Sequence, residues 1–183
     1  MRTNNLAKNE QGFTLLETMI AILVLSIGVL GLAALLGNGL VFLNGSQADF
    51  IAQQKAAEAI ECVFTARDTQ VLAWAQIQNI AGGGLFLTGA QPITDPGPDG
   101  LVGTVADSGV NPSTIIYPGK DGILGTADDV VLKLSDAYNM TRTITITNIV
   151  NEPSVRQIQV IINYQSGRFV RSYTLTTYIS QYS

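Results

Sequence analysis

The chain begins with a polar stretch and then becomes continuously apolar. Residues 1–12 are polar, whereas the 24 residues from Phe13 to Leu36 contain a single charge, Glu17. A helix of that length, with a rise of 1.5 Å per residue, measures about 36 Å and can cross a hydrocarbon core of about 30 Å. The run is also longer than the apolar core of a secretory signal peptide, which has about 7 to 15 residues. The pattern therefore predicts a membrane-spanning helix over residues 13–40.

Beyond this span the apolar residues follow a helical period. Over residues 41–80 they recur at spacings of three, four or seven, while charged residues face away. The apolar positions are Phe50, Ala57, Ile60, Phe64, Val71 and Trp74, and the charged ones are Lys55, Glu58, Arg67 and Asp68. This predicts an amphipathic helix with one stripe that covers a core. Five glycines between Gly28 and Gly45 indicate either a bend in the helix or close packing against other helices.

The last third of the chain alternates with a period of two. Isoleucines and valines oppose threonines and glutamines in residues 141–150, 155–164 and 168–179. The breaks between these segments are short enough for hairpins. The predicted fold class is α+β: an antiparallel meander packs on the helix stripe, with Val130–Leu134 as a fourth strand. The head then spans residues 81–183, with its sheet at 130–183.

The composition of the chain excludes several classes of function. Of 183 residues 46% are apolar and only 13% are charged, which agrees with a membrane segment. The formal charge of −4 gives no reason to expect a nucleic-acid partner. The absence of His excludes Ser-His-Asp triads and His-containing zinc sites, and no phosphate loop or nucleophile elbow occurs, so we expect no enzymatic activity. The lone Cys62 has no basic neighbour in sequence and is expected to be a small buried hydrophobe.

An internal repeat lies in the middle of the chain. The string PGPDGLVGTVAD (96–107) is followed by PGKDGILGTADD (118–129), inside a loop-rich region at 95–129. The acids are Asp95, Asp99 and Asp107 in the first copy and Asp121, Asp128 and Asp129 in the second. Hard oxygen ligands on a glycine-bent loop suit calcium, although Gly97 stands where an EF-hand has its second ligand. The alternative is that the Asp-Gly and Pro-Gly pairs only form turns.

Glu17 requires a partner. A carboxylate within a membrane helix costs about 2.5 to 3.5 kcal/mol on insertion scales unless a cation pairs with it. No Lys or Arg lies within helical reach of Glu17 on the span. The cation must therefore come from elsewhere.

The residues around Glu17 resemble a known signal. The string Gly12-Phe13-Thr14-Leu15-Leu16-Glu17, between a short basic leader and an apolar helix, resembles the class III signal of type IV prepilins and type II secretion pseudopilins. The resemblance implies a leader, residues 1–12, that prepilin peptidase removes after Gly12, with methylation of the new terminal amine of Phe13. It also implies that Glu17 pairs with the terminal amine of a neighbouring subunit, and that the fold is the pilin fold.

Weaker similarities favour one branch of this family. Residues 26–40 and 175–180 resemble the minor pilins called PilV, or type IV pilus modification proteins, although pseudopilins of the GspI type begin similarly. The resemblance implies a structural subunit for pilus biogenesis, adhesion or motility, with other pilins as partners. Arg2 and Lys8 before the span predict an inner-membrane protein with a cytoplasmic amino terminus that later reaches the pilus or cell surface. The alternatives are a secretion pseudopilin and a membrane-tethered calcium-dependent adhesin.

Overall fold

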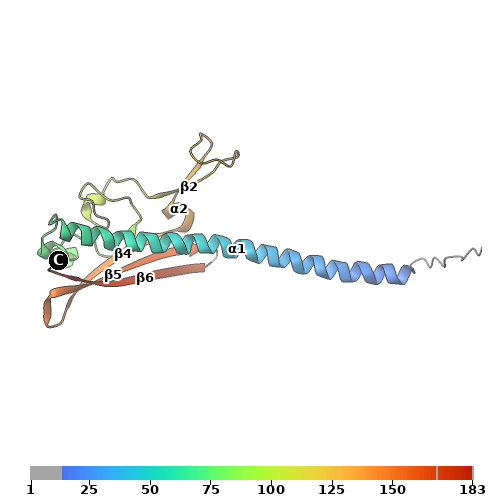
Figure 1. Ribbon diagram of the computed structural model, residues 1–183, viewed down its shortest axis with the longest axis horizontal. Coiled ribbons are helices and arrows are strands. Elements are labelled where there is room, and N and C mark those ends of the chain that lie inside the picture. The colour runs from blue at the N-terminus through green and yellow to red at the C-terminus, as the bar shows by residue number, and fades with distance from the viewer. Residues whose placement is uncertain (1–13, 168, 183) are drawn as a thin grey trace, which may run out of the picture. The chain divides into compact units, whose positions relative to one another are not determined.

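The computed structural model describes residues 14–167 and 169–182, apart from the side chains of residues 41–45. The chain divides into two compact units, Met1–Leu43 and Asn44–Ser183. Helix α1 (Leu15–Asp68) supplies the described part of the first unit and the first element of the second (Figure 1).

Helix α1 ends earlier than the amphipathic pattern predicted. It stops at Asp68 rather than near residue 80, and Gln70 beyond it has a left-handed φ of 57°, which a continuing helix cannot contain. Two short 3-10 helices follow, η1 (Trp74–Gln76) and η2 (Ile80–Gly82). The predicted helix over residues 41–80 is thus correct only as far as Asp68.

The buried stripe of α1 also differs from the predicted one. Phe50, Ala57 and Val71 are exposed, and the other predicted stripe residues are only half-buried. The residues that are buried are Ala48, Ala52, Ala56, Ala59, Val63 and Ala66. They recur at helical spacing, but most carry a single methyl group, so the sheet can approach the helix closely and fill the space with larger side chains. Size complementarity, rather than hydrophobicity alone, selects the buried face.

The main sheet confirms the predicted meander. Strands β4 (Thr141–Ile149), β5 (Glu152–Ser166) and β6 (Phe169–Ser180) pair antiparallel in chain order, and Figure 1 shows them alongside the carboxyl-terminal part of α1. The sheet order is β1-β4-β5-β6, with β1 (Gln91–Pro92) as its fourth strand. The fold class is α+β, as predicted.

The prediction for residues 130–134 was correct for a strand and wrong for its sheet. Strand β3 (Val130–Lys133) does not join the main sheet but pairs with β2 (Thr114–Tyr117) in a separate two-stranded hairpin. The second loop repeat connects the two strands directly, which makes this local pairing available without a long-range crossover. The short helix α2 (Leu134–Tyr138) follows and leads into β4.

The core is built from the alternation seen in the sequence. The inward residues of the central strands are buried, namely Ile144, Ile146, Ile158, Val160 and Ile162, while the threonines and glutamines between them face outward. Loop residues complete the core, among them Phe86, Ile93, Leu101 and Val102.

Two polar contacts fix the loops after α1 to the sheet. The side-chain amide of Asn79 donates to Ile144 O (2.8 Å) and accepts from Ile146 N (2.8 Å), so it pairs with β4 as a strand would. Arg156 lies over the Trp74 ring, 4.2 Å from its centroid, and donates to the Ile77 carbonyl oxygen at 2.8 Å.

Candidate functional site: the apolar helix and the repeated acidic loop

The amino-terminal part of α1 has the properties of a membrane span. Residues Leu15–Leu40 have a mean hydropathy of 2.8, and their length and composition would allow a membrane crossing. Thr14 precedes the helix, and its Oγ1 accepts the Glu17 N–H at 3.3 Å, as an N-cap residue does. The helix continues through its glycines without a break. A Cβ added at Gly28 or Gly31 would meet no described atom within 4 Å, so the described residues do not pack closely against these glycines.

Glu17 stands in the first turn of α1 with its side chain exposed. The ion pairs in the described part of the chain are Lys55–Glu58, Arg67–Asp68 and Arg171–Asp49, and none involves Glu17. The cation that the carboxylate needs within a membrane is therefore not supplied by the described residues. Gly12 and Phe13, the predicted processing residues, lie outside the described residues.

The first copy of the repeat is a loop closed by its own aspartates. Asp99 Oδ1 accepts from Leu101 N (3.0 Å) and its Oδ2 accepts from the Thr104 hydroxyl (2.8 Å). Asp107 Oδ2 accepts from Gly103 N (2.6 Å) and from the Thr94 hydroxyl (3.3 Å). The short helix η3 (Val105–Asp107) ends the copy. The two carboxylates therefore hold the turns of this copy through local hydrogen bonds.

The second copy repeats this arrangement at positions shifted by 22. Asp121 Oδ1 accepts from Ile123 N (2.9 Å), and Asp129 Oδ2 accepts from Gly125 N (2.7 Å). One difference stands out, because the Thr126 hydroxyl donates to Asp128 (2.7 Å) and the first copy has an alanine at that place. Asp128 also accepts from the backbone N–H of Lys120 (2.6 Å).

The backbone conformation of the two copies agrees as well. The φ angles are 71° at Gly100 and 72° at Gly122, and 79° at Gly103 and 90° at Gly125. All four values lie in the left-handed region that favours glycine. The internal repeat recognised in the sequence is therefore a repeat in structure.

The six predicted metal ligands do not converge. The first copy brings Asp99 and Asp107 together around Gly97, whereas Asp95 turns away and accepts from the Ser113 hydroxyl at 2.7 Å. Within the described ranges, no group of three or more Asp, Glu, Cys or His side chains is placed to hold a metal ion. Their oxygens serve mainly as acceptors inside each loop. Asp107 Oδ1 and Asp129 Oδ1, at the same repeat position, are buried and accept no hydrogen bond from any described group.

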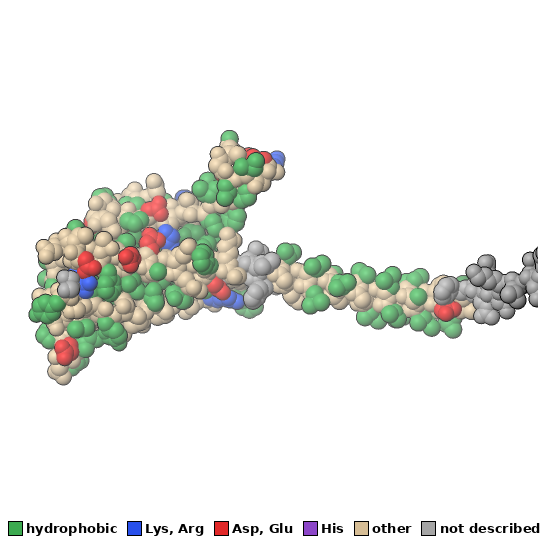
Figure 2. Space-filling view, in the orientation of Figure 1, with side chains coloured by type: hydrophobic (Ala, Val, Ile, Leu, Met, Phe, Trp, Pro, Cys, Tyr) green, Lys and Arg blue, Asp and Glu red, His purple; other side chains and the backbone are tan. Residues whose placement is uncertain are grey.

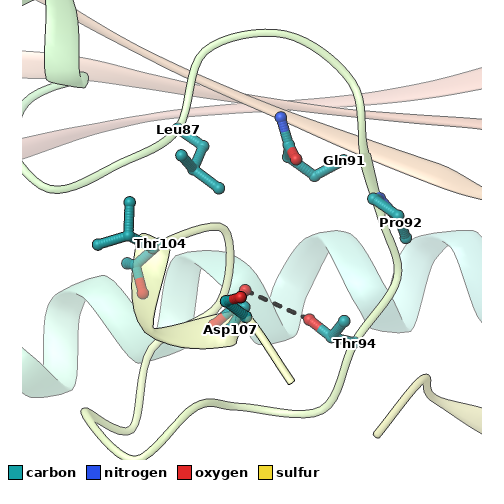
Figure 3. Close-up of a pocket in the computed structure, with 8 residues that line it drawn as sticks. Leu87, Gln91, Pro92, Thr94, Thr104 and Asp107 are labelled. Carbon is teal, nitrogen blue, oxygen red and sulfur yellow. Dashed lines mark hydrogen bonds between the residues drawn. The ribbon is translucent and has the colours of Figure 1, made fainter. Parts of the chain in front are cut away.

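A cavity of about 580 Å³ opens beside the first copy. Its apolar walls come from Leu87, Pro92 and Val105, while Gln91 and Asp107 contribute polar groups (Figure 3). No pattern in the sequence predicted this cavity, because its lining comes from Leu87, from β1 and the residues after it, and from η3 with its flanking residues, which share no motif.

Arg142 was also missed by sequence reasoning. It is 1% exposed, and its three guanidinium nitrogens have no hydrogen-bond partner among the described residues. Burial lowers the pKa of Arg142, against the opposing fields of Glu58 and Asp107. Arginine alternating with isoleucine in β4 is the only signal that could have placed it inside.

Cys62 is less buried than the sequence analysis predicted. It is half-buried on α1, and burial, followed by the charge of Glu58, raises the pKa of its thiol. A raised pKa keeps the sulfur protonated at neutral pH, which disfavours nucleophilic chemistry.

Comparison with known proteins finds a family match near the amino terminus. Residues 7–33 match the family described as the prokaryotic N-terminal methylation motif. Searches of curated proteins and of solved structures found no match. The motif supports a protein of the type IV pilin-like or pseudopilin-like kind. Together with the apolar helix, it supports membrane anchoring and processing by prepilin peptidase.

Proposed function

We propose that this protein is a minor type IV pilin of the PilV kind, a structural subunit that does no chemistry of its own. The observation that carries the proposal is the methylation motif at residues 7–33, which runs into the apolar helix Leu15–Leu40 with Glu17 in its first turn. The subunit is held in the inner membrane with its amino terminus cytoplasmic. After cleavage between Gly12 and Phe13 and methylation of Phe13, it is assembled at or into the pilus.

The physical step is a change of surroundings for the helix. In the membrane its apolar side chains contact lipid, and in a filament they contact similar helices, so little hydrophobic free energy changes. The direction of assembly then depends on polar pairing and on the assembly motor. Glu17 has no cation within the described chain, and the terminal amine of a neighbouring subunit would supply one in a medium where such pairing is strong.

Replacing Glu17 tests this role. Glu17→Ala is expected to leave membrane insertion intact and to lower the amount of the protein in purified pili at least tenfold, because the helix remains apolar but loses its charge partner. Ser26→Ala is the matched control, since Ser26 lies on the same helix and its hydroxyl bonds only the Ile22 carbonyl at 2.7 Å. Normal pilus content of the Glu17 variant would refute the role.

Processing is tested separately. Mass spectrometry of the mature protein is expected to show a chain that starts at N-methylated Phe13. A chain that functions while it retains residues 1–12 would contradict the proposal as a whole.

A secretion pseudopilin is the second candidate, because the motif at residues 7–33 is shared by both groups. The two differ in their surroundings. Recovery of the protein in sheared pili supports a pilin, whereas loss of protein secretion without loss of pili on deletion supports a pseudopilin.

Calcium binding by the loops remains a prediction. The buried, unpartnered oxygens of Asp107 and Asp129 are the observation that favours it. A calcium-dependent adhesin tethered by the same helix would be the corresponding function. Titration calorimetry with calcium is expected to give heat, and EGTA is expected to lower the melting temperature. Absence of both effects would leave turn formation as the role of these acids.

A further inference from the structure

The turn between β5 and β6 exposes two neighbouring apolar side chains. Phe169 is 66% exposed and Val170 is 83% exposed, and both stand at the start of β6. Ser166 of β5 pairs with Phe169, so the connection is tight and the two residues lie at its tip. An aromatic ring beside a valine costs free energy while both face water, and the position of the turn shows what can cover them.

Three contacts hold this turn beside the first residues that the head takes from α1. Arg171 forms an ion pair with Asp49 at 2.8 Å, and the Tyr164 hydroxyl donates to the same carboxylate at 2.7 Å. Gln47 lines a cavity of about 530 Å³ together with residues 165–167. The turn therefore lies at the end of the sheet where the second compact unit begins.

Strand β6 also gives the direction in which the turn points. At the far end of the strand the Ser180 carbonyl oxygen accepts from Arg67 at 3.0 Å, and near its start Arg171 pairs with Asp49. Going back along β6 thus means moving toward the amino-terminal end of α1. Phe169 precedes Arg171 by two residues, which adds about 7 Å in that direction.

The predicted membrane span ends close to this point of the chain. Its last residue is Leu40, and Asp49 follows nine residues later. Nine helical residues measure about 14 Å, and even nine fully extended residues reach only about 32 Å. Figure 2 shows the span covered by apolar side chains, as contact with lipid requires. When the span lies in a bilayer, the turn is therefore near the interface, which is about 5 to 7 Å thick on each side.

The chemistry of this end of the head suits a lipid interface. The sequence from Gln165 to Arg171 contains no acidic residue, so lipid phosphates do not repel it. Tyr117 and Tyr138, whose hydroxyl oxygens are 2.8 Å apart, line the same cavity as the turn. Tyrosine is enriched where membranes meet water, because its ring is apolar and its hydroxyl is polar.

We propose that Phe169 and Val170 insert into the interface of the same bilayer that holds the span, while the subunit is stored in the membrane. The inference rests on the membrane anchoring in the proposed function and adds a second contact to it. Two side chains are too few to bind a membrane alone, but the span keeps the turn at the bilayer at a high effective concentration. Extraction of the subunit for assembly then has to break this contact as well as the lipid contacts of the helix.

Quenching of tryptophan fluorescence tests the contact in the full chain. The chain is reconstituted in phosphatidylcholine vesicles with bromine on the acyl chains near the headgroups, and in unbrominated vesicles, because bromine quenches tryptophan only at short range. Phe169→Trp is expected to add fluorescence of which the brominated lipid removes at least half. Trp74, the sole native tryptophan, donates to the Pro153 carbonyl oxygen at the opposite end of the sheet and is expected to emit equally in both lipids.

Two valines provide a matched comparison. Val170 and Val150 are both 83% exposed, and they lie at the β5–β6 and β4–β5 turns, at opposite ends of the sheet. Tryptophan at such exposed positions preserves the fold. The added fluorescence of Val170→Trp should be quenched at least five times more strongly than that of Val150→Trp. Equal quenching of the two, or an unquenched Phe169→Trp, would overturn the proposal.

A tryptophan within the span separates this proposal from the proposed function. Leu25→Trp is expected to be strongly quenched, since Leu25 lies inside the predicted span. Quenching of Leu25→Trp without quenching of Phe169→Trp would leave the anchor in place and overturn only the contact of the turn. An unquenched Leu25→Trp would contradict membrane anchoring itself, and the contact of the turn with it.

Discussion

The two loop copies, residues 96–107 and 118–129, have the same turns and different surroundings. In both, an aspartate after the second glycine-containing turn accepts a glycine N–H, at 2.6 Å for Asp107 and 2.7 Å for Asp129. Yet Leu101 and Val102 of the first copy are buried in the core, whereas the second copy forms the exposed tip of the β2–β3 hairpin. The loop is therefore made by local hydrogen bonds and glycine dihedrals, and burial is an addition to it rather than its cause.

The largest expected difference between the copies comes from their apolar pairs. Leu101→Ala should lower the free energy of unfolding by about 3 kcal/mol, because it leaves a cavity in the core. Ile123→Ala should lower it by less than about 0.5 kcal/mol, because Ile123 contacts mainly solvent in the single chain. Urea unfolding of the full chain in detergent, followed by the fluorescence of Trp74, the sole tryptophan, measures both values. Equal losses would contradict the assignment of one copy to the core.

A smaller difference is expected at the third glycine of each loop. Alanine at Gly103 or Gly125 must adopt a left-handed φ, which costs about 1 to 2 kcal/mol in either copy. At Gly103 the new Cβ would also lie 2.7 Å from Ile144 Cδ1, whereas at Gly125 it would meet no described atom within 4 Å.

Thermal unfolding of the two variants, compared with the unmodified chain, measures this difference. Gly103→Ala should be the more destabilised by about 1 kcal/mol, since Ile144 is packed in the core and can move only a little. The same melting temperature for both variants would mean that the Ile144 side chain can move away from the new methyl group without loss of stability.

The comparison also shows what the sequence could predict. The 22-residue offset and the conserved spacing of Gly and Asp within the chain predict two similar loops, because these residues determine turns locally. The strict alternation in residues 141–164 predicts the faces of β4 and β5, because a strand has a period of two.

Packing could not be predicted in the same way. Leu101-Val102 and Ile123-Leu124 are equally hydrophobic, so nothing in the two strings says which pair is buried. The prediction of the buried helix stripe was wrong for a related reason. Large residues such as Phe50 indicated the buried face, whereas alanines occupy it. Methylation at Phe13 and pairing of Glu17 stay predictions, because both depend on other molecules. The charge of Glu17 only required a cation, and the resemblance to a known signal indicated which one.

The smallest expected effect is the protonation of Asp128 at low pH. Asp128 has no counterpart in the first copy, where Ala106 stands. The hydrogen bond from the Thr126 hydroxyl, assisted by backbone N–H groups of Asp121 and Lys120, lowers the pKa of Asp128. Because the folded pKa lies below the ordinary value of about 3.9, the charged carboxylate stabilises the second loop above that pH, and this contribution is lost as the pH falls through the folded pKa.

An acid titration followed by NMR can detect this loss at the tip of the β2–β3 hairpin. The amide resonances of Lys120 and Asp121 in the full chain should move with a midpoint below pH 3.9, the ordinary aspartate value. Thr126→Val should shift that midpoint upward, because it removes the strongest of the stabilising hydrogen bonds. The resonance of the Leu101 amide, which lies in the first copy, should be the same with and without Thr126→Val. A midpoint that does not respond to Thr126→Val would show that Asp128 is not what distinguishes the exposed loop.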